Sequence, residues 1–310
     1  MSYLVTARKW RPQTFESVVG QEHVTRTLQN SLRQNRLAHS YLFSGPRGVG
    51  KTTLARILVK ALNCEKGPTP TPCNVCSYCV EINEGRSLDY QEIDGASNRG
   101  IDQIRELNQS LGYLSPNQRH RVFVIDEVHM LTTEAFNALL KSLEEPPPKV
   151  VFVFCTTEAH KVPLTIRSRC QHHHFRAFSI PAITDQLRNI LSAEKIAFEE
   201  ESLFPIARAA NGSMRDSQSL LDQVIAYAGE KITSSAVREV LGIIGSDNHF
   251  HFMEYLLAGD LAKNQALLLN LAHEGRDLKQ FVLDLIHFLT ALVFIQKGVA
   301  SSHDLEVSPE

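Results

Sequence analysis

The sequence GPRGVGKT, residues 45–52, decides the fold, because it stands between a short apolar run and an amphipathic helical segment. Its spacing is G-x-x-x-x-G-K-T, in which glycines let backbone N–H groups curve around phosphate. The following helix N-terminus adds positive potential. This arrangement predicts a phosphate-binding loop, in which Lys51 reaches the β and γ phosphates and the Thr52 hydroxyl binds Mg²⁺. The expected nucleotide contacts in the loop are Gly45, Pro46, Arg47, Gly48, Val49, Gly50, Lys51, Thr52 and Thr53.

Short apolar runs alternate with amphipathic segments around this loop, from Ala38 to Phe175. Such alternation is typical of a parallel sheet covered by helices, so we predict an α/β domain with five parallel strands over residues 1–179. The predicted strands are Ser40–Phe43, Tyr90–Ile93, Val122–Ile125, Val150–Cys155 and His172–Phe175. The predicted helices are His23–Gln34, Lys51–Leu62, Gly100–Leu111 and Thr133–Glu144.

After about Ser179 the strand pattern ceases and helical periodicity follows, which predicts a small all-helical domain over residues 180–243. A second helical domain is expected over residues 244–310. Within it, an apolar stripe recurs at helical spacing and forms either a core of this chain or a seam between copies. The residues of the stripe are Phe281, Leu285, Phe288, Leu292 and Ile295.

The composition is that of a globular protein, with 310 residues, 43% of them hydrophobic, and a net charge of −2. Because the chain has no overall positive charge, any contact with nucleic acid has to come from a local basic patch. The opening residues MSYLVTARKWRP are polar and basic, and no segment approaches the uninterrupted apolar length of a membrane span. We therefore expect a cytoplasmic protein that does not enter a membrane.

Two acidic residues follow an apolar run in RVFVIDEVHML, residues 121–131. Ligands of open α/β sheets bind at this end of the strands. Asp126 is placed to hold Mg²⁺, directly or through water, and Glu127 to orient and deprotonate an attacking water. The alternative is that both acids cap the next helix. The letters DEVH also fit a helicase pattern, but residues 180–310 show no second parallel-sheet core, which such helicases need.

Four cysteines, Cys64, Cys73, Cys76 and Cys79, have the spacing C-x8-C-x2-C-x2-C. In a reducing compartment closely spaced cysteines are metal ligands more often than disulfides. Four thiolates suit tetrahedral Zn²⁺ and leave no open position for water, so we predict a structural zinc site. An iron–sulfur cluster is the alternative, because the same ligand set can hold one.

Taken together, these motifs resemble those of the AAA+ ATPases and, within them, the γ/τ subunits of the bacterial DNA polymerase III clamp loader. The resemblance is strong over residues 1–243 and weaker beyond. It implies an ATPase that opens a sliding clamp and places it on primed DNA, with residues 244–310 as an incomplete helical collar. A scaffold that uses the fold without hydrolysing ATP is the alternative. The matching stretches are ARKWRPQTFESVVGQEH, GPRGVGKT, the four cysteines, IDEVHML, NALLKSLEEPP, TT after the fourth strand, SRC and GSMRDS.

The resemblance also implies roles for single residues. Arg169 of SRC corresponds to an arginine finger that reaches the ATP of a neighbouring subunit, and Thr157 corresponds to the sensor that orients the water. Arg215 of GSMRDS corresponds to a second sensor, carried by the helical lid. The residues implied for the adenine pocket are Arg11, Pro12, Val18 and Val19. Those implied for DNA, around a predicted helix start, are Ser97, Asn98, Arg99 and Arg105.

The partners implied by the resemblance are the δ and δ′ subunits and further γ/τ copies, which form a pentamer with three γ/τ chains. The sliding clamp and primed DNA are the implied substrates. A longer C-terminal region, absent from this chain, is expected to contact the polymerase core and the helicase.

Overall fold

The computed structural model describes residues 5–111, 119–242 and 246–298. The chain divides into two compact units. One unit contains Ala7–Phe178 and Gly212–Arg215, and the other contains the residues up to Thr6, Ser179–Asn211 and the chain from Asp216 onward, so α1 begins at the boundary. The second unit holds both predicted helical domains, so the predicted boundary between them at residue 243 stays a prediction. The predicted boundary at residue 179 also stays a prediction.

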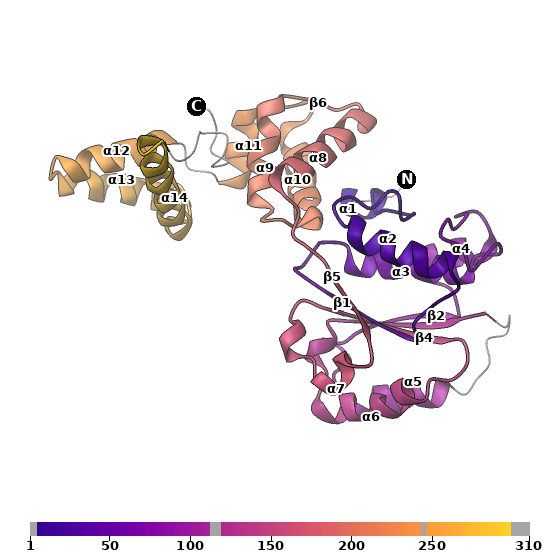
Figure 1. Cartoon of the computed structure of the whole chain (residues 1–310). Coiled ribbons are helices and arrows are strands. Elements are labelled where there is room, and N and C mark those ends of the chain that lie inside the picture. The colour runs from indigo at the N-terminus through magenta and orange to yellow at the C-terminus, as the bar shows by residue number, and fades with distance from the viewer. Residues whose placement is uncertain (1–4, 112–118, 243–245, 299–310) are drawn as a thin grey trace. The chain divides into compact units, whose positions relative to one another are not determined.

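The first unit is built on a five-stranded parallel sheet with the order β2-β3-β4-β1-β5 (Figure 1). All five predicted strands are confirmed, and no observed end differs from the predicted one by more than one residue. Every residue of β1 and β4 is buried, as expected of near-continuous apolar strands inside a parallel sheet. The strands are β1 (Ser40–Ser44), β2 (Tyr90–Asp94), β3 (Arg121–Asp126), β4 (Val150–Thr156) and β5 (Gln171–His174).

Helices cover both faces of this sheet, as Figure 1 shows. Successive strand residues point to opposite faces, so Phe43 packs in one core and its neighbour Leu42 in the other. The first core is covered by α2 (Glu22–Arg33) and α3 (Lys51–Asn63). The second core is covered by α5 (Ile101–Ser110), α6 (Thr133–Glu144) and α7 (Leu164–Arg167). The shorter elements of this unit are α1 (Thr6–Lys9), α4 (Ser77–Glu84), η1 (Val128–Met130) and η2 (Ala159–Lys161).

The second unit is helical with one exception. Two-residue strands, β6 (Ala197–Phe198) and β7 (Lys231–Ile232), pair in parallel, so the prediction that strands cease after Ser179 was wrong. Two residues are too few to give the alternation by which a strand is recognised in sequence. The helical elements are α8 (Ile180–Glu194), η3 (Glu200–Ser202), α9 (Leu203–Ala209), α10 (Met214–Ala228), α11 (Ser234–Leu241), α12 (Ser246–Leu257), α13 (Leu261–His273) and α14 (Leu278–Gln296).

Helix α14 carries the predicted apolar stripe, and its two ends differ. Phe281 is buried and stacks on His249 of α12, whereas Leu292 and Ile295 are nearly half exposed. The first part of the stripe is therefore a core contact. By length and composition alone α14 could also cross a membrane, which corrects the expectation that no segment approaches that length. Asp284, inside this helix, forms an ion pair with Arg208 of α9.

Candidate active site

The phosphate-binding loop has a backbone that only glycine adopts easily at three positions. Gly45, Gly48 and Gly50 have φ angles of +148°, +74° and +96°. A Cβ added to Gly45 would lie 2.4 Å from the carbonyl oxygen of Phe175, and one added to Gly48 would lie 1.9 Å from Ser213 Oγ. The glycines thus permit both the turn and the close approach of the surrounding chain.

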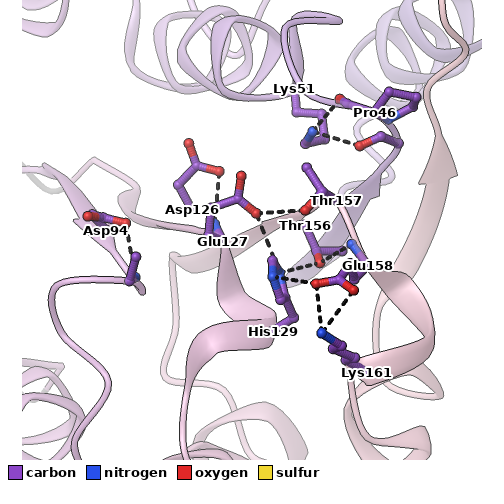
Figure 2. A network of polar contacts seen from close by, with 12 residues as sticks. Pro46, Lys51, Asp94, Asp126, Glu127, His129, Thr156, Thr157, Glu158 and Lys161 are labelled. Carbon is purple, nitrogen blue, oxygen red and sulfur yellow. Dashed lines mark hydrogen bonds and ion pairs between the residues drawn. The ribbon is translucent and has the colours of Figure 1, made fainter. Parts of the chain in front are cut away.

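Lys51 begins α3 and folds back into this loop. Its Nζ donates hydrogen bonds to the carbonyl oxygens of Gly45, at 2.8 Å, and Pro46, at 2.7 Å (Figure 2). The side chain is buried, and burial lowers the pKa of Lys51. The ammonium is therefore held against the loop by two of its carbonyl oxygens.

Thr52 and Asp126, the two residues predicted to bind Mg²⁺, lie in direct contact. The Thr52 hydroxyl donates to Asp126 Oδ2 at 2.8 Å, although the residues are 74 positions apart. The sheet order explains the meeting, because β3 and β1 flank β4 and both end at the same edge. A hydroxyl and a carboxylate are oxygen ligands of the kind Mg²⁺ takes, so this pair fits the predicted ion.

Glu127 follows the end of β3 in a left-handed conformation, with φ +44°. Its Oε2 accepts a hydrogen bond from Thr157 Oγ1, at 3.1 Å, from the residue just after β4 (Figure 2). The structure thus brings together the predicted catalytic base and the predicted sensor from adjacent strands. Asp126 Oδ1 accepts from the backbone N–H of Glu127 at 2.9 Å, which fixes the two acids relative to each other.

A histidine that the sequence analysis did not single out lies beside this pair. His129 Nδ1 is 3.4 Å from Glu127 Oε2 and 3.0 Å from Thr156 Oγ1, and its Nε2 is 3.1 Å from Glu158 Oε2 (Figure 2). Only 6% of the His129 side chain is exposed. The signal for it in the sequence is the fourth letter of DEVH, a histidine two residues after Glu127.

Arg169 lies between α7 and β5 and faces α6. Its guanidinium pairs with Glu144 and donates to the carbonyl oxygen of Thr165 at 2.8 Å. In the described part of the chain Arg169 has no hydrogen bond to the phosphate-binding loop, so the structure does not join it to the other site residues.

Arg215, in the first turn of α10, does approach the phosphate-binding loop. Its backbone N–H points to the Gly48 carbonyl oxygen at 3.4 Å, and Ser213 packs against the same glycine. The structure therefore brings the predicted second sensor to the loop, as part of the unit that contains Gly212–Arg215.

The residues predicted to bind adenine lie in the N-terminal segment of the first unit. Val18 packs against the core, Val19 is 39% exposed, and Pro12 is half-buried. Burial lowers the pKa of Arg11, and the positive charge of Arg56 lowers it further.

An open cavity of about 410 Å³ lies beside Asp126. It is lined by Arg56, Gly85, Tyr90, Glu92, Asp94 and Asp126.

The four cysteines converge at the end of α3. Cys64, Cys73, Cys76 and Cys79 have their sulfur atoms within 4.8 Å of one another. In a tetrahedral zinc site with Zn–S bonds of about 2.3 Å the sulfurs stand roughly 3.8 Å apart, so the cluster has nearly the required size. Backbone N–H groups of Val75 and Cys76 lower the pKa of the Cys73 thiol to about 6, which favours a thiolate. The donor set thus fits a metal ion with no place for a water ligand.

The residues predicted to bind DNA surround the start of α5, but three of them serve the local turn. Ser97 Oγ donates to Asp94 Oδ2 at 2.6 Å, Asn98 Nδ2 to the Asp94 carbonyl oxygen at 3.0 Å, and Arg99 Nε to the Ala96 carbonyl oxygen at 2.9 Å. Arg105 is exposed, and its guanidinium is 3.3 Å from Asp102. Arg99 and Arg105 are both exposed, and Arg105 is the one whose guanidinium does not bind the backbone of the turn.

Comparison with solved structures identifies the fold. Thermotoga maritima RuvB, a Holliday junction branch migration motor, superposes with a TM-score of 0.56 at 17% identity, covering 80% of this chain and 79% of RuvB. A single-residue variant of the same RuvB gives a TM-score of 0.57 at 17% identity, with 86% of each chain covered. At this identity the likeness concerns the fold alone, a parallel sheet with helices followed by a helical part.

Sequence comparison identifies the family. A family model described as DNA polymerase III, delta subunit, matches residues 20–179, and one described as DNA polymerase III clamp loader subunit, ATPase lid domain, matches residues 182–230. The tau subunit of Escherichia coli K12 is 45% identical over 97% of this chain and 47% of its own length. The tau subunit of Bacillus subtilis strain 168 is 46% identical over 93% of this chain and 51% of its own length. The gamma subunit of Buchnera aphidicola subsp. Schizaphis graminum is 40% identical, over 96% of this chain and 82% of its own length.

This chain spans about half the length of the tau subunits that it matches and most of that gamma subunit. The identities exceed 30% over nearly the whole chain, and the two family models follow each other along it. The chain belongs to the family of DNA polymerase III tau/gamma subunits.

Proposed function

We propose that this chain is the ATP-hydrolysing motor part of a bacterial replicative clamp loader, which opens a sliding clamp and places it on primed DNA. Membership of the tau/gamma family supports the loader. The observation that carries the hydrolytic function is the meeting of Thr52, Asp126, Glu127 and Thr157 at one edge of the sheet, beside the phosphate-binding loop.

The site residues divide the chemistry of hydrolysis among them. Lys51 and the loop amides bind the phosphates of ATP, and Thr52 with Asp126 holds Mg²⁺, which neutralises charge on the phosphates. Glu127 takes a proton from the attacking water, and Thr157, whose hydroxyl donates to the Glu127 carboxylate, orients that water. Arg215 contacts phosphate from the segment Gly212–Arg215, which lies in the same unit as the loop.

Arg169 is proposed to act on the nucleotide of a neighbouring subunit. A guanidinium is permanently charged and forked, so it matches phosphate oxygens, and its delivery by a neighbour makes hydrolysis depend on assembly. The contacts of Arg169 with α6 and α7 support a role away from its own phosphate-binding loop. The proposed neighbours are further γ/τ copies with one δ and one δ′ subunit, joined partly through the exposed end of α14.

The cysteine cluster is proposed to bind Zn²⁺ as a structural ion. Four sulfur ligands leave no position for a substrate, which supports structure rather than catalysis. DNA binding is proposed for the α5 start, mainly through Arg105, because exposed guanidinium groups pair with backbone phosphates. The proposed compartment is the cytoplasm, where the chromosome of a bacterium is replicated.

One assay separates this function from the two alternatives. ATP turnover is measured for the assembled protein alone, with the clamp, with primed DNA, and with both. Strong stimulation by clamp and primed DNA together supports clamp loading. Strand separation instead supports a helicase, although the described residues hold one five-stranded parallel sheet and no second one. Absence of turnover in every mixture supports a scaffold and contradicts the proposal.

A further inference from the structure

His129 occupies a buried position between two carboxylates, as Figure 2 shows. It belongs to η1, directly after the strand that ends in Asp126. One ring nitrogen faces Glu127 and the other faces Glu158, at 3.4 Å and 3.1 Å. A side chain with 6% exposure and polar partners at both ends is held in a single orientation.

The partners of the ring restrict where its hydrogen atoms lie. The Glu158 carboxylate can only accept, so Nε2 of His129 carries the hydrogen that binds it. On the other side, Nδ1 faces the Thr156 hydroxyl at 3.0 Å and the Glu127 carboxylate at 3.4 Å. With a hydrogen on Nδ1 as well, the ring is a charged imidazolium and donates toward the Glu127 carboxylate. With no hydrogen on Nδ1 the ring is neutral and accepts from the Thr156 hydroxyl.

Glu158 is itself fixed, so it anchors the ring. Its Oε1 pairs with Lys161 at 2.9 Å, and its backbone N–H donates to Thr156 Oγ1 at 3.0 Å. The hydrogen bond from Lys161 is the main reason why the pKa of Glu158 lies below its ordinary value. The ring of His129 therefore links Glu127 to the turn that begins η2.

We propose that His129, with a hydrogen on each ring nitrogen, is a positioning residue for hydrolysis, which holds the Glu127 carboxylate against Thr157 and ties it to Glu158. The inference rests on the proposed function, because it presumes that Glu127 is the base. Glu127 is about one-third exposed. Among the residues that the structure describes, Thr157 and His129 have side chains that reach its Oε2. Removal of His129 leaves that carboxylate with one of these two contacts.

The test compares three variants of the full-length protein in its assembled complex. His129→Ala is expected to lower kcat about 10- to 100-fold, because misplacing a catalytic group by about 1 Å can cost that much, while the Kd for ATP stays unchanged. His129→Asn retains an amide nitrogen near the position of Nδ1, and is expected to recover most of the lost turnover. His160→Ala is the matched control, since His160 is 76% exposed and 4.0 Å from the same Glu158; its kcat is expected to stay unchanged.

Glu127→Gln, measured alongside, separates failure of the inference from failure of the proposed function. If Glu127→Gln keeps full turnover, Glu127 is not the base and the proposed function fails first. If Glu127→Gln is inactive but His129→Ala turns over like His160→Ala, the inference is wrong. The inference is also wrong if His129→Asn weakens ATP binding as much as it lowers kcat. Equal losses indicate that His129 maintains the structure of the whole site and does not position Glu127 alone. If His129→Ala does not unfold cooperatively, it is not correctly folded, and the kcat and the Kd for ATP of His129→Asn are compared with those of His160→Ala instead.

Discussion

Replacing Gly48 with alanine tests how the phosphate-binding loop is packed against the start of α10. Gly48 has φ +74°, a left-handed conformation that costs other residues about 1–2 kcal/mol. The new methyl group would also lie 1.9 Å from Oγ and 3.0 Å from Cβ of Ser213. Displacing packed atoms of this kind costs about 1–3 kcal/mol more. Gly48→Ala is therefore expected to lose about 2–5 kcal/mol of the free energy of unfolding, as the sum of these two ranges.

Gly50→Ala is the matched control in the same loop. Gly50 has φ +96°, but no atom lies within 4 Å of an added Cβ, so only the backbone cost applies. Urea unfolding without nucleotide should show Gly48→Ala less stable than Gly50→Ala by about 1–3 kcal/mol. The double variant Gly48→Ala/Ser213→Gly should regain that difference in the free energy of unfolding, because the clash is removed. Only the cost of the left-handed backbone at residue 48 should remain. Equal stability of the two alanine variants, or no recovery in the double variant, would refute the packing argument.

Three further predictions concern the proposed roles of side chains. Arg169→Ala should lower ATP turnover of the assembled complex by about 10³-fold or more, as loss of an arginine finger does, while leaving the Kd of the chain for ATP unchanged; retained turnover excludes the role. Cys76→Ser should release the bound metal, measured with a chromogenic chelator, yet leave turnover within a few-fold, because the 13-residue α3 separates cluster and loop by about 20 Å. Arg105→Ala should reduce the slope of log K for DNA against log salt by about 1, and an unchanged slope contradicts a phosphate contact.

The sheet and its site could be predicted because their signals are local. Apolar runs fixed the strand positions, and parallel strands bring their C-terminal ends to one edge, which placed Thr52 near Asp126. The contacts of His129 could not be predicted, since they depend on side chains from β4 and the following turn. The sequence did not reveal β6 and β7, because two residues are too few to show the alternation of apolar and polar side chains that marks a strand. The structure of one chain cannot show the proposed target of Arg169, because that target is the nucleotide of a neighbouring subunit.

The central claim is that hydrolysis at Glu127 drives repeated clamp loading. The most direct measurement counts labelled clamps retained on primed circular DNA per loader complex, with the unaltered protein and with Glu127→Gln, under saturating ATP. If Glu127 is the base, Glu127→Gln binds ATP with nearly unchanged affinity and loads no more than about one clamp per complex, whereas the unaltered complex loads many. Many clamps loaded per complex by the Glu127→Gln variant would contradict it.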